Sequence, residues 1–309
     1  MTTNSIIYHL KKGAGFFSEF FFMVNHYIYC KKENIPFNLN TEHWLFKSKE
    51  GWTDYFKTIE NQNNTKTDEP QQYSFGHIIE NYNIEEYKDA IKEIYRYNDS
   101  IQNKITYTMN LLDLTPNTYA SIFIRRGDKL LYESKLYETE LYIEKLLQLC
   151  PDCKNIFIQT DDYQCILDIE KYIKSNNLDK IQIKTICKPD MRGIFIDNNN
   201  SDIQSNIDKN KHYINAIKPN ISTYKTVHQM DSNEIFEHTC DMLIGIDILL
   251  QSTYCILDYQ SNVSRFIKLA HQNPLNVYDI DNYYMDMQSN ICPAYPESVY
   301  KDPDTFRKG

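Results

Sequence analysis

Two hydrophobic patterns alternate along the second half of the chain. Short apolar runs rich in β-branched residues predict buried strands, and the segments between them carry apolar positions at helical spacing. Strands are predicted at 119–124, 155–160, 181–186, 254–259 and 275–280, with helices at 138–149, 163–175, 234–250 and 263–271. This alternation is typical of a parallel sheet covered by helices, as in a Rossmann-type fold.

The first part of the chain also has an α/β pattern. It predicts a strand at 5–10, a helix from the glycine-containing turn at 13–15 to about Lys32, and a second strand at 35–39. A polar loop is expected at 60–72, and apolar residues recur at helical spacing over 84–112 before "LTPNT" breaks the helix. We therefore expect two domains, an N-terminal α/β lobe at 1–115 and a Rossmann-type lobe at 116–309.

Composition narrows the function classes. The chain has 309 residues and a formal net charge of −9, which disfavours a general nucleic-acid surface. No signal peptide or membrane span is recognisable, and the cysteines are scattered, so a soluble cytoplasmic protein is expected. Cys150 and Cys153 have Cys-x-x-Cys spacing, but no second pair supports a metal site, and none is predicted. The oligomeric state stays open.

Polar side chains follow three predicted strands of the second lobe. Arg125 and Arg126 end the first strand, Asp161 and Asp162 end the next, and the segment 258–262 follows a later one. Ligands of such sheets bind beyond the carboxyl ends of the strands. One guanidinium group can donate two parallel hydrogen bonds to phosphate oxygens. Two such groups at one strand end therefore predict a diphosphate site. This interpretation requires that they face an anion other than internal carboxylates.

Two predicted helix starts add further candidates. Ser261 and Asn262 begin the helix at 263–271, where backbone N–H groups, a hydroxyl and an amide could face an anion. Gly13 and Gly15 precede the first helix and allow close approach of a ligand to the backbone. Each feature alone also fits an ordinary turn.

Four motifs in sequence order resemble those of the α1,6- and α1,2-fucosyltransferases. "IFIRRGDK" is similar to their H-x-R-R-T-D-K and H-x-R-R-G-D motifs, and "KGAGFFSEF" resembles their first Gly-rich loop. "LLQSTYCILDYQSNVSRFIKLA" and "VYDIDNYYMDMQSN" resemble later motifs of the α1,6 enzymes. The resemblance implies a GT-B-like pair of lobes with a cleft between them, GDP-fucose as donor, a glycan or glycoside hydroxyl as acceptor, and inversion without a metal or other cofactor.

The resemblance also implies roles for individual residues. Arg125 and Arg126 match the arginines that hold the donor diphosphate, and Ser261 and Asn262 match a Ser-Gln pair near the same phosphates. Glu133 matches the general base, with Lys129 beside it; the alternative for Glu133 is a solvated residue at a helix start. Asp161 and Asp162 match a paired-Asp strand end, which either contacts donor or acceptor or caps the next helix.

Three departures from the family pattern leave alternatives open. Phe123 replaces the leading His of the motif, and Gly127 follows the second Arg, as in the α1,2 group. Gly245 occupies the place of the family's guanine-reading Asp, so Asp247 is the expected substitute and Asp241 a less favoured one. The alternatives are a transferase that uses another nucleotide sugar and an inactive nucleotide- or carbohydrate-binding protein on the same scaffold.

Overall fold

The computed structural model describes residues 5–11, 14–59, 71–74, 76–132, 135–193, 211 and 226–281. The chain divides into two compact units, one formed by Met1–Arg96 with Met285–Gly309 and the other by Tyr97–Tyr284. Helix α3 (Asp99–Leu111) packs on α9 (Ser232–Leu250) and so belongs to the second unit. The sequence-based division after residue 115 counted this helix with the first lobe.

The first unit contains a three-stranded parallel sheet in the order β2-β1-β3. Its strands are β1 (Ile6–His9), β2 (Phe37–Asn40) and β3 (Gln71–Ser74), and its helices are α1 (Phe16–Glu33) and α2 (Ile84–Ile94). Aromatic side chains fill much of the core, since α1 buries a run of phenylalanines and Trp52 stacks on Phe56 with ring centroids 4.2 Å apart. Strands β1 and β2 and helix α1 confirm the pattern-based predictions.

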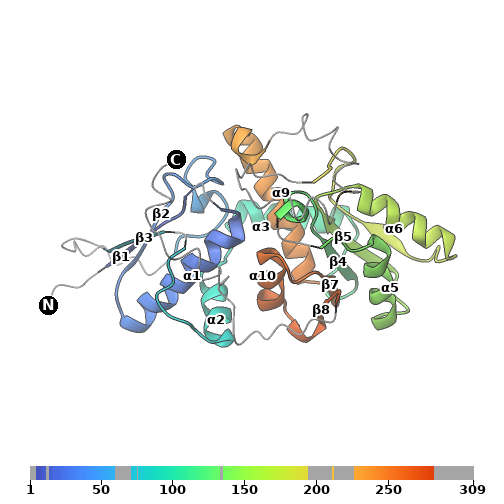
Figure 1. Cartoon of the computed structure of the whole chain (residues 1–309), viewed down its shortest axis with the longest axis horizontal. Coiled ribbons are helices and arrows are strands. Elements are labelled where there is room, and N and C mark those ends of the chain that lie inside the picture. The colour runs from blue at the N-terminus through green and yellow to red at the C-terminus, as the bar shows by residue number, and fades with distance from the viewer. Residues whose placement is uncertain are drawn as a thin grey trace. The chain divides into compact units, whose positions relative to one another are not determined.

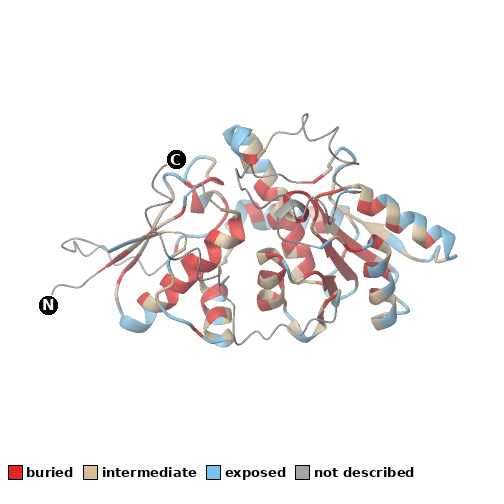
Figure 2. Cartoon of the chain, viewed as in Figure 1, coloured by how far each residue is buried: buried red, intermediate tan, exposed pale blue. Residues whose placement is uncertain are grey.

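The second unit is a five-stranded parallel sheet in the order β6-β5-β4-β7-β8. Its strands are β4 (Ala120–Ile124), β5 (Asn155–Thr160), β6 (Gln182–Lys184), β7 (Tyr254–Leu257) and β8 (Val277–Asp279). All five residues of β4 are buried, as Figure 2 shows for the centre of this sheet. This is the strand order of a Rossmann fold, whose direction of winding reverses next to its first strand, here β4.

Helices cover both faces of this sheet. On one side, α5 (Thr139–Leu149) and α6 (Gln164–Ser175) pack against each other, and on the other α9 packs with α10 (Asn262–Ala270) (Figure 1). Right-handed crossovers require this arrangement, because the chain winds outward from β4 first through β5 and β6 and then through β7 and β8. The buried isoleucines of β4, β5 and α6 form the core beneath α5 and α6.

The structure adds three details that the hydrophobic pattern did not predict. The helical region at 84–112 is two helices, because Asn98 caps α3 and its side chain accepts a hydrogen bond from Ile101 N. Residues 71–72 were placed in a loop but begin β3. A short helix, α4 (Asp128–Tyr132), follows the loop after β4.

Candidate functional site at the carboxyl edge of the second sheet

The polar strand ends of the second unit lie together at one edge of the sheet. Ile124, the last residue of β4, pairs with Thr160, the last residue of β5, so the loops that follow them begin side by side. β7 lies on the other side of β4, which places the loop after Leu257 at the same edge. The reversal between β4 and β7 is the position where open α/β sheets bind ligands.

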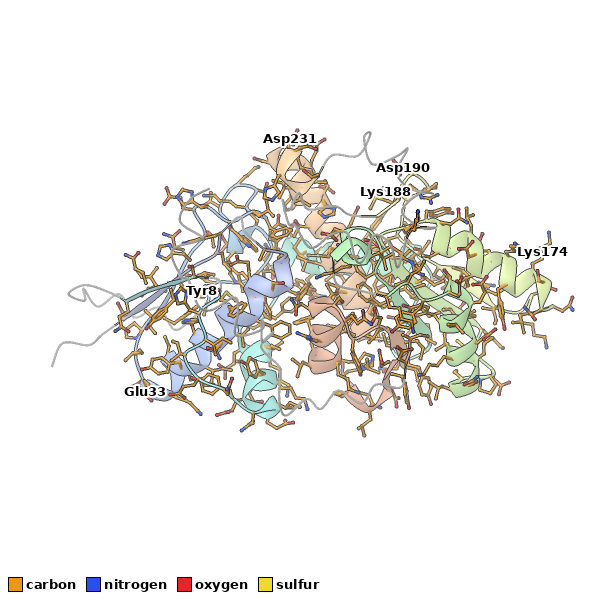
Figure 3. The ribbon with its side chains drawn as sticks, viewed as in Figure 1. Tyr8, Glu33, Lys174, Lys188, Asp190 and Asp231 are labelled. Carbon is orange, nitrogen blue, oxygen red and sulfur yellow. The ribbon has the colours of Figure 1, made fainter. Side chains whose placement is uncertain are left out.

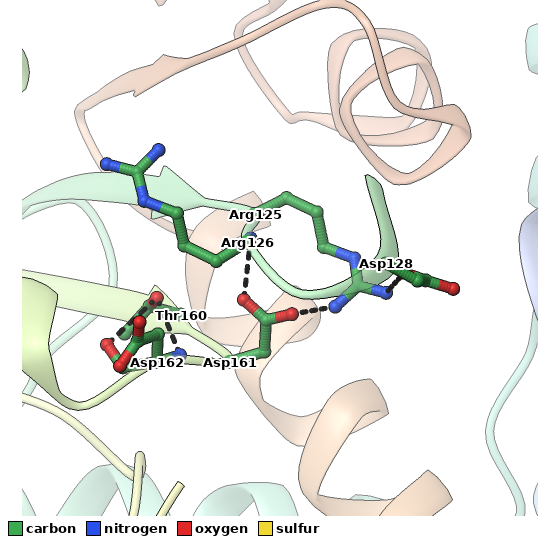
Figure 4. Close-up of polar contacts among 6 residues, drawn as sticks. All are labelled: Arg125, Arg126, Asp128, Thr160, Asp161 and Asp162. Atoms are coloured by element: carbon green, nitrogen blue, oxygen red, sulfur yellow. Dashed lines mark hydrogen bonds and ion pairs between the residues drawn. The ribbon is translucent and has the colours of Figure 1, made fainter. Parts of the chain in front are cut away.

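Arg125 is held by two carboxylates from neighbouring loops (Figure 4). Its Nη1 donates to Asp161 Oδ2, and its Nη2 donates to Asp128 Oδ1 at 2.8 Å. The Arg125 side chain is 16% exposed, so most of it is buried and a small part is open to solvent. Because it binds both carboxylates, the Arg125 guanidinium connects the loop after β4 to the loop after β5.

The Arg126 side chain points away from Arg125 (Figure 4). It is buried, and its Nη2 donates to the carbonyl of Tyr137 at 2.7 Å and to Thr139 Oγ1 at 3.4 Å. Consecutive residues at a strand end project to opposite faces of a sheet, which accounts for the divergence. Arg126 therefore anchors the segment that leads into α5.

The structure thus differs from the sequence-based picture of a joint arginine clamp. Two guanidinium groups that point in opposite directions do not bind one diphosphate together. Arg125 pairs with the internal carboxylates of Asp128 and Asp161, so the condition stated above for a diphosphate site is not met in this structure. Arg126 is buried and bonded within the fold. Of the two predicted phosphate ligands, Arg125 alone has a partly exposed side chain at the edge where a ligand would bind.

Asp161 and Asp162 have separate structural partners. Asp161 Oδ1 accepts from Arg126 N at 2.7 Å while its other oxygen pairs with Arg125. Asp162 accepts from Gln164 N at 3.0 Å, at the start of α6, and forms an ion pair with Arg192 Nε at 3.2 Å. Asp162 therefore fits the alternative of a residue that binds the start of the next helix. Asp161 instead orients the Arg125 side chain.

The loop between β4 and α4 turns sharply at Gly127. Its φ is +63°, in the left-handed region that glycine adopts without a steric cost. Lys129 follows in α4 and is half-buried. Glu133, the expected general base, lies outside the described residues, so its role stays a prediction.

Ser261 and Asn262 begin α10 as predicted. The Ser261 hydroxyl caps the helix, accepting from Ser264 N at 3.1 Å, and Asn262 Oδ1 accepts from Arg265 Nη1 at 3.2 Å. Gln260, just before them, accepts from Lys135 N at 3.0 Å and so connects this turn to the segment after α4. The predicted phosphate contacts of Ser261 and Asn262 stay predictions.

Asp247 lies at the opposite end of the sheet from these loops. Helix α9 runs from the carboxyl edge back to the amino edge, where Tyr119, which precedes β4, donates its hydroxyl hydrogen bond to Ile248 O at 2.6 Å. Asp247 accepts from Gln251 at this far end, and burial raises its pKa to about 6. Asp247 thus lies away from the loops after β4, β5 and β7, and its predicted contact with the donor stays a prediction.

The Gly-rich turn of the first unit is partly described. Gly15 is the N-cap of α1, with an ordinary extended backbone, and Gly13 lies outside the described residues. Glu19 follows in the first turn of α1 and is fully buried. The predicted donor contacts of Gly13 and Gly15 stay predictions.

Sequence reasoning missed His238, which lies in the first half of α9. Burial and, after it, the positive charge of Arg125 lower its pKa to about 4, so the ring is neutral at pH 7. A histidine inside a helical segment gave no signal in the sequence, since its relation to Arg125 depends on how α9 crosses the sheet. Its neighbour Asp241 forms an ion pair with Lys188 at 2.9 Å.

Among the described residues, no group of histidine, cysteine, aspartate and glutamate side chains is arranged to hold a metal ion. Across the same parts of the chain, none of the helices has the length and apolar character needed to cross a membrane.

The chain is similar in structure to NodZ fucosyltransferases. NodZ α1,6-fucosyltransferase soaked with GDP-fucose matches with a TM-score of 0.56 and 9% identity, over 90% of this chain and 96% of that chain. Fucosyltransferase NodZ from Bradyrhizobium matches with a TM-score of 0.56 and 10% identity, over 91% and 97% of the two chains. No family model and no curated protein matches the sequence.

These matches extend over both units of the chain. The chain therefore has the α/β fold of GT-B fucosyltransferases, and the resemblance that its motifs indicated is confirmed at the level of the fold. At about 10% identity, the likeness defines the architecture and leaves the chemistry to be argued from the site.

Proposed function

We propose that the protein is a glycosyltransferase that moves fucose from GDP-fucose to a hydroxyl group of a glycan or glycoside. The observation that carries this proposal is the position of Arg125. Its partly exposed side chain lies at the reversal of strand order in a chain with the GT-B fucosyltransferase fold. A fixed positive charge at this edge can stabilise the diphosphate as it leaves the sugar.

The proposed reaction is a direct displacement with inversion. The acceptor hydroxyl oxygen bonds to the anomeric carbon of fucose while the bond from that carbon to the β-phosphate oxygen breaks, and GDP leaves with the electron pair. Glu133 takes the hydroxyl proton, with Lys129 beside it keeping the carboxylate ionised. Arg125 balances the charge that develops on GDP, so the chemistry needs no metal ion.

Arg125 must exchange partners for this role. Phosphate oxygens accept the same paired guanidinium hydrogen bonds as carboxylate oxygens. Arg125 can therefore exchange a carboxylate partner for a phosphate partner without leaving its position. Asp161 remains attached to the backbone of Arg126 during such an exchange, which keeps the loop in place. The first lobe is the proposed acceptor side.

A second candidate function is binding without catalysis. The two ion pairs of Arg125 and the burial of Arg126 favour an inactive nucleotide- or carbohydrate-binding protein on the same scaffold. Phe123, in the place of the family histidine, favours a transferase for a different nucleotide sugar. Both alternatives predict outcomes that differ from those of the main proposal.

The test combines binding and turnover. A thermal-shift screen of nucleoside diphosphates, with and without magnesium, should give a strong shift with GDP alone that does not depend on the metal. Release of GDP from GDP-fucose, measured with and without a panel of glycan acceptors, should then increase with an acceptor. A GDP shift without any turnover would identify the binding protein, and a stronger shift with another diphosphate would exclude GDP-fucose.

A further inference from the structure

Two cysteines lie in the turn between α5 and β5. Cys150 is the C-cap of α5, and Cys153 comes just before β5. A crossover helix returns the chain from the carboxyl edge of a parallel sheet to its amino edge, so this turn lies at the amino edge of the second sheet. Figure 3 shows the two edges through labelled residues, since Lys188 follows β6 at the carboxyl edge and Lys174 lies in the last turn of α6 at the amino edge. The cysteine pair is therefore separate from the candidate site.

The segment 150–153 is a hydrogen-bonded β-turn. Cys153 N donates to Cys150 O at 3.2 Å, and Pro151 takes the second position, where its fixed φ favours a turn. The Cα atoms of the first and fourth residues of a β-turn lie within about 7 Å of each other. A disulfide joins Cα atoms that are about 4.4 to 6.8 Å apart. The backbone thus holds the two side chains at a separation that a disulfide can span.

The two thiol groups are neighbours with different surroundings. The charge of Cys150 and a hydrogen bond between the two side chains both act on Cys153, so the sulfur atoms lie close together. Cys153 Sγ also lies 3.3 Å from Asn155 O, which accepts its proton. Burial, and after it the charge of Cys150, raises the pKa of Cys153 to about 12, so this thiol is protonated at neutral pH. Cys150 is therefore the expected first nucleophile of the pair.

Accessibility distinguishes this pair from most other cysteines of the described chain. Cys150 and Cys153 are both partly exposed, as is Cys187, which follows β6 at the other edge of the sheet. The buried cysteines are Cys30, Cys165, Cys240 and Cys255. Among the described residues, no third histidine, cysteine or carboxylate joins the pair in a metal-binding group. Because a structural zinc ion takes four ligands, two adjacent thiols favour a redox reaction instead.

We propose that Cys150 and Cys153 form a reversible disulfide by exchange with a small-molecule disulfide such as oxidised glutathione. The Cys150 thiolate attacks one sulfur of the oxidant, the sulfur–sulfur bond of the oxidant breaks, and one glutathione leaves with the electron pair. The Cys153 sulfur, as it loses its proton, then attacks the Cys150 sulfur and displaces the second glutathione. Two electrons pass from the cysteines to the oxidant, and the two thiol protons end on the released glutathione molecules. This redox-sensitive modification site is independent of the proposed transfer reaction.

The test measures the disulfide directly in the full chain. The protein is equilibrated in buffers with different ratios of oxidised to reduced glutathione, alkylated and digested with trypsin. Trypsin cuts after Lys145 and Lys154 and leaves both cysteines in one peptide, which mass spectrometry detects. As the ratio rises, this peptide should lose two hydrogen atoms and both sites of alkylation. Cys187→Ser removes a partly exposed thiol at the other edge of the sheet and, as the control, should leave this transition unchanged.

Single substitutions test the order of attack. Cys153→Ser keeps the first nucleophile and should stop at the mixed disulfide, detected as one glutathione bound to Cys150. Cys150→Ser should leave Cys153 reduced at ratios that fully oxidise the wild type. The wild type unfolded in urea tests the role of the turn. It should need a ratio about tenfold higher than the folded chain, because ordering the backbone of one residue costs about that factor in an equilibrium constant.

The outcomes that would overturn the proposal are specific. A peptide that keeps two reduced thiols at every ratio, or that carries two separate glutathione molecules, excludes a disulfide between Cys150 and Cys153. Equal midpoints for the folded and unfolded chains exclude the turn as its cause. Circular dichroism checks the fold of each variant, and if a serine variant does not fold, the wild-type titrations with and without urea decide.

Discussion

The buried carboxyl group of Glu19 makes the stability of the first unit depend on pH. This side chain lies in the first turn of α1 with no exposed surface. Burial raises its pKa from 4.5 to about 8, although the backbone and charge of Lys11 act in the opposite direction. The folded unit therefore keeps this group protonated at neutral pH.

The sign and size of the effect follow from proton linkage. Between pH 4.5 and 8 the folded state binds more protons at Glu19 than the unfolded state, so the free energy of unfolding falls as pH rises. The slope is about 1.4 kcal/mol per pH unit, and the full loss is about 5 kcal/mol above pH 8. Glu19→Gln, a neutral side chain of the same shape, should remove this loss, matching the wild type near pH 4.5 and exceeding its stability at pH 8.

Tryptophan fluorescence measures this unit separately. The chain has two tryptophans, Trp44 and Trp52, and both are buried in the first unit. Urea unfolding followed by their emission at pH 5, 7 and 8.5 gives the difference between Glu19→Gln and the wild type. Glu33→Gln, at the exposed end of the same helix, is the control. If the free energy of unfolding changes with pH equally in Glu19→Gln and the wild type, the conclusion that Glu19 is buried in its neutral form is refuted.

Further predictions concern residues that follow β4 and β5. Arg125→Lys keeps the positive charge but loses the paired hydrogen bonds, so the rate of fucose transfer should fall about 100-fold or more while circular dichroism stays unchanged; an unaffected rate would contradict the diphosphate role. Glu133→Gln should bind GDP-fucose as the wild type does and lose transfer, measured by calorimetry and product release, and unchanged turnover would remove it as the base. Asp161→Ala leaves Arg126 N without its acceptor and should lower the free energy of unfolding by about 2 kcal/mol, whereas a change below about 0.5 kcal/mol in thermal or urea unfolding would show that the bridge contributes little.

The sequence predicted those elements whose side chains carry a periodic pattern. Strand β5 has the predicted bounds, because "NIFIQT" is a continuous apolar run, and α9 was predicted from its long apolar segment. Strand β3 was missed because "QQYS" has no buried face and is held by backbone pairing to β1. Such an edge strand depends on its neighbour rather than on its own residues.

The sequence predicted that three polar strand ends lie at one edge of the sheet, and the structure brings them together there because parallel strands align their carboxyl ends. The geometry at this edge was predicted only in part. The divergence of Arg125 and Arg126 was also available from the two-residue period of a strand, which the clamp hypothesis overlooked. The positions of Asp247 and His238 relative to that edge required the direction of α9 across the sheet, which a single helical segment does not reveal.

The pairing of β4 with β7 has a consequence for how the protein is made. Contacts across this junction join residues far apart in the chain, as in the hydrogen bond between the hydroxyls of Ser121 and Ser252 at 2.7 Å. The half-sheet of β4, β5 and β6 can assemble once residue 184 has been synthesised, whereas β7 arrives only with residues 254–257. Since distant pairings form late, the junction of β4 with β7 can form only after the half-sheet of β4, β5 and β6, and β8 joins β7 later still.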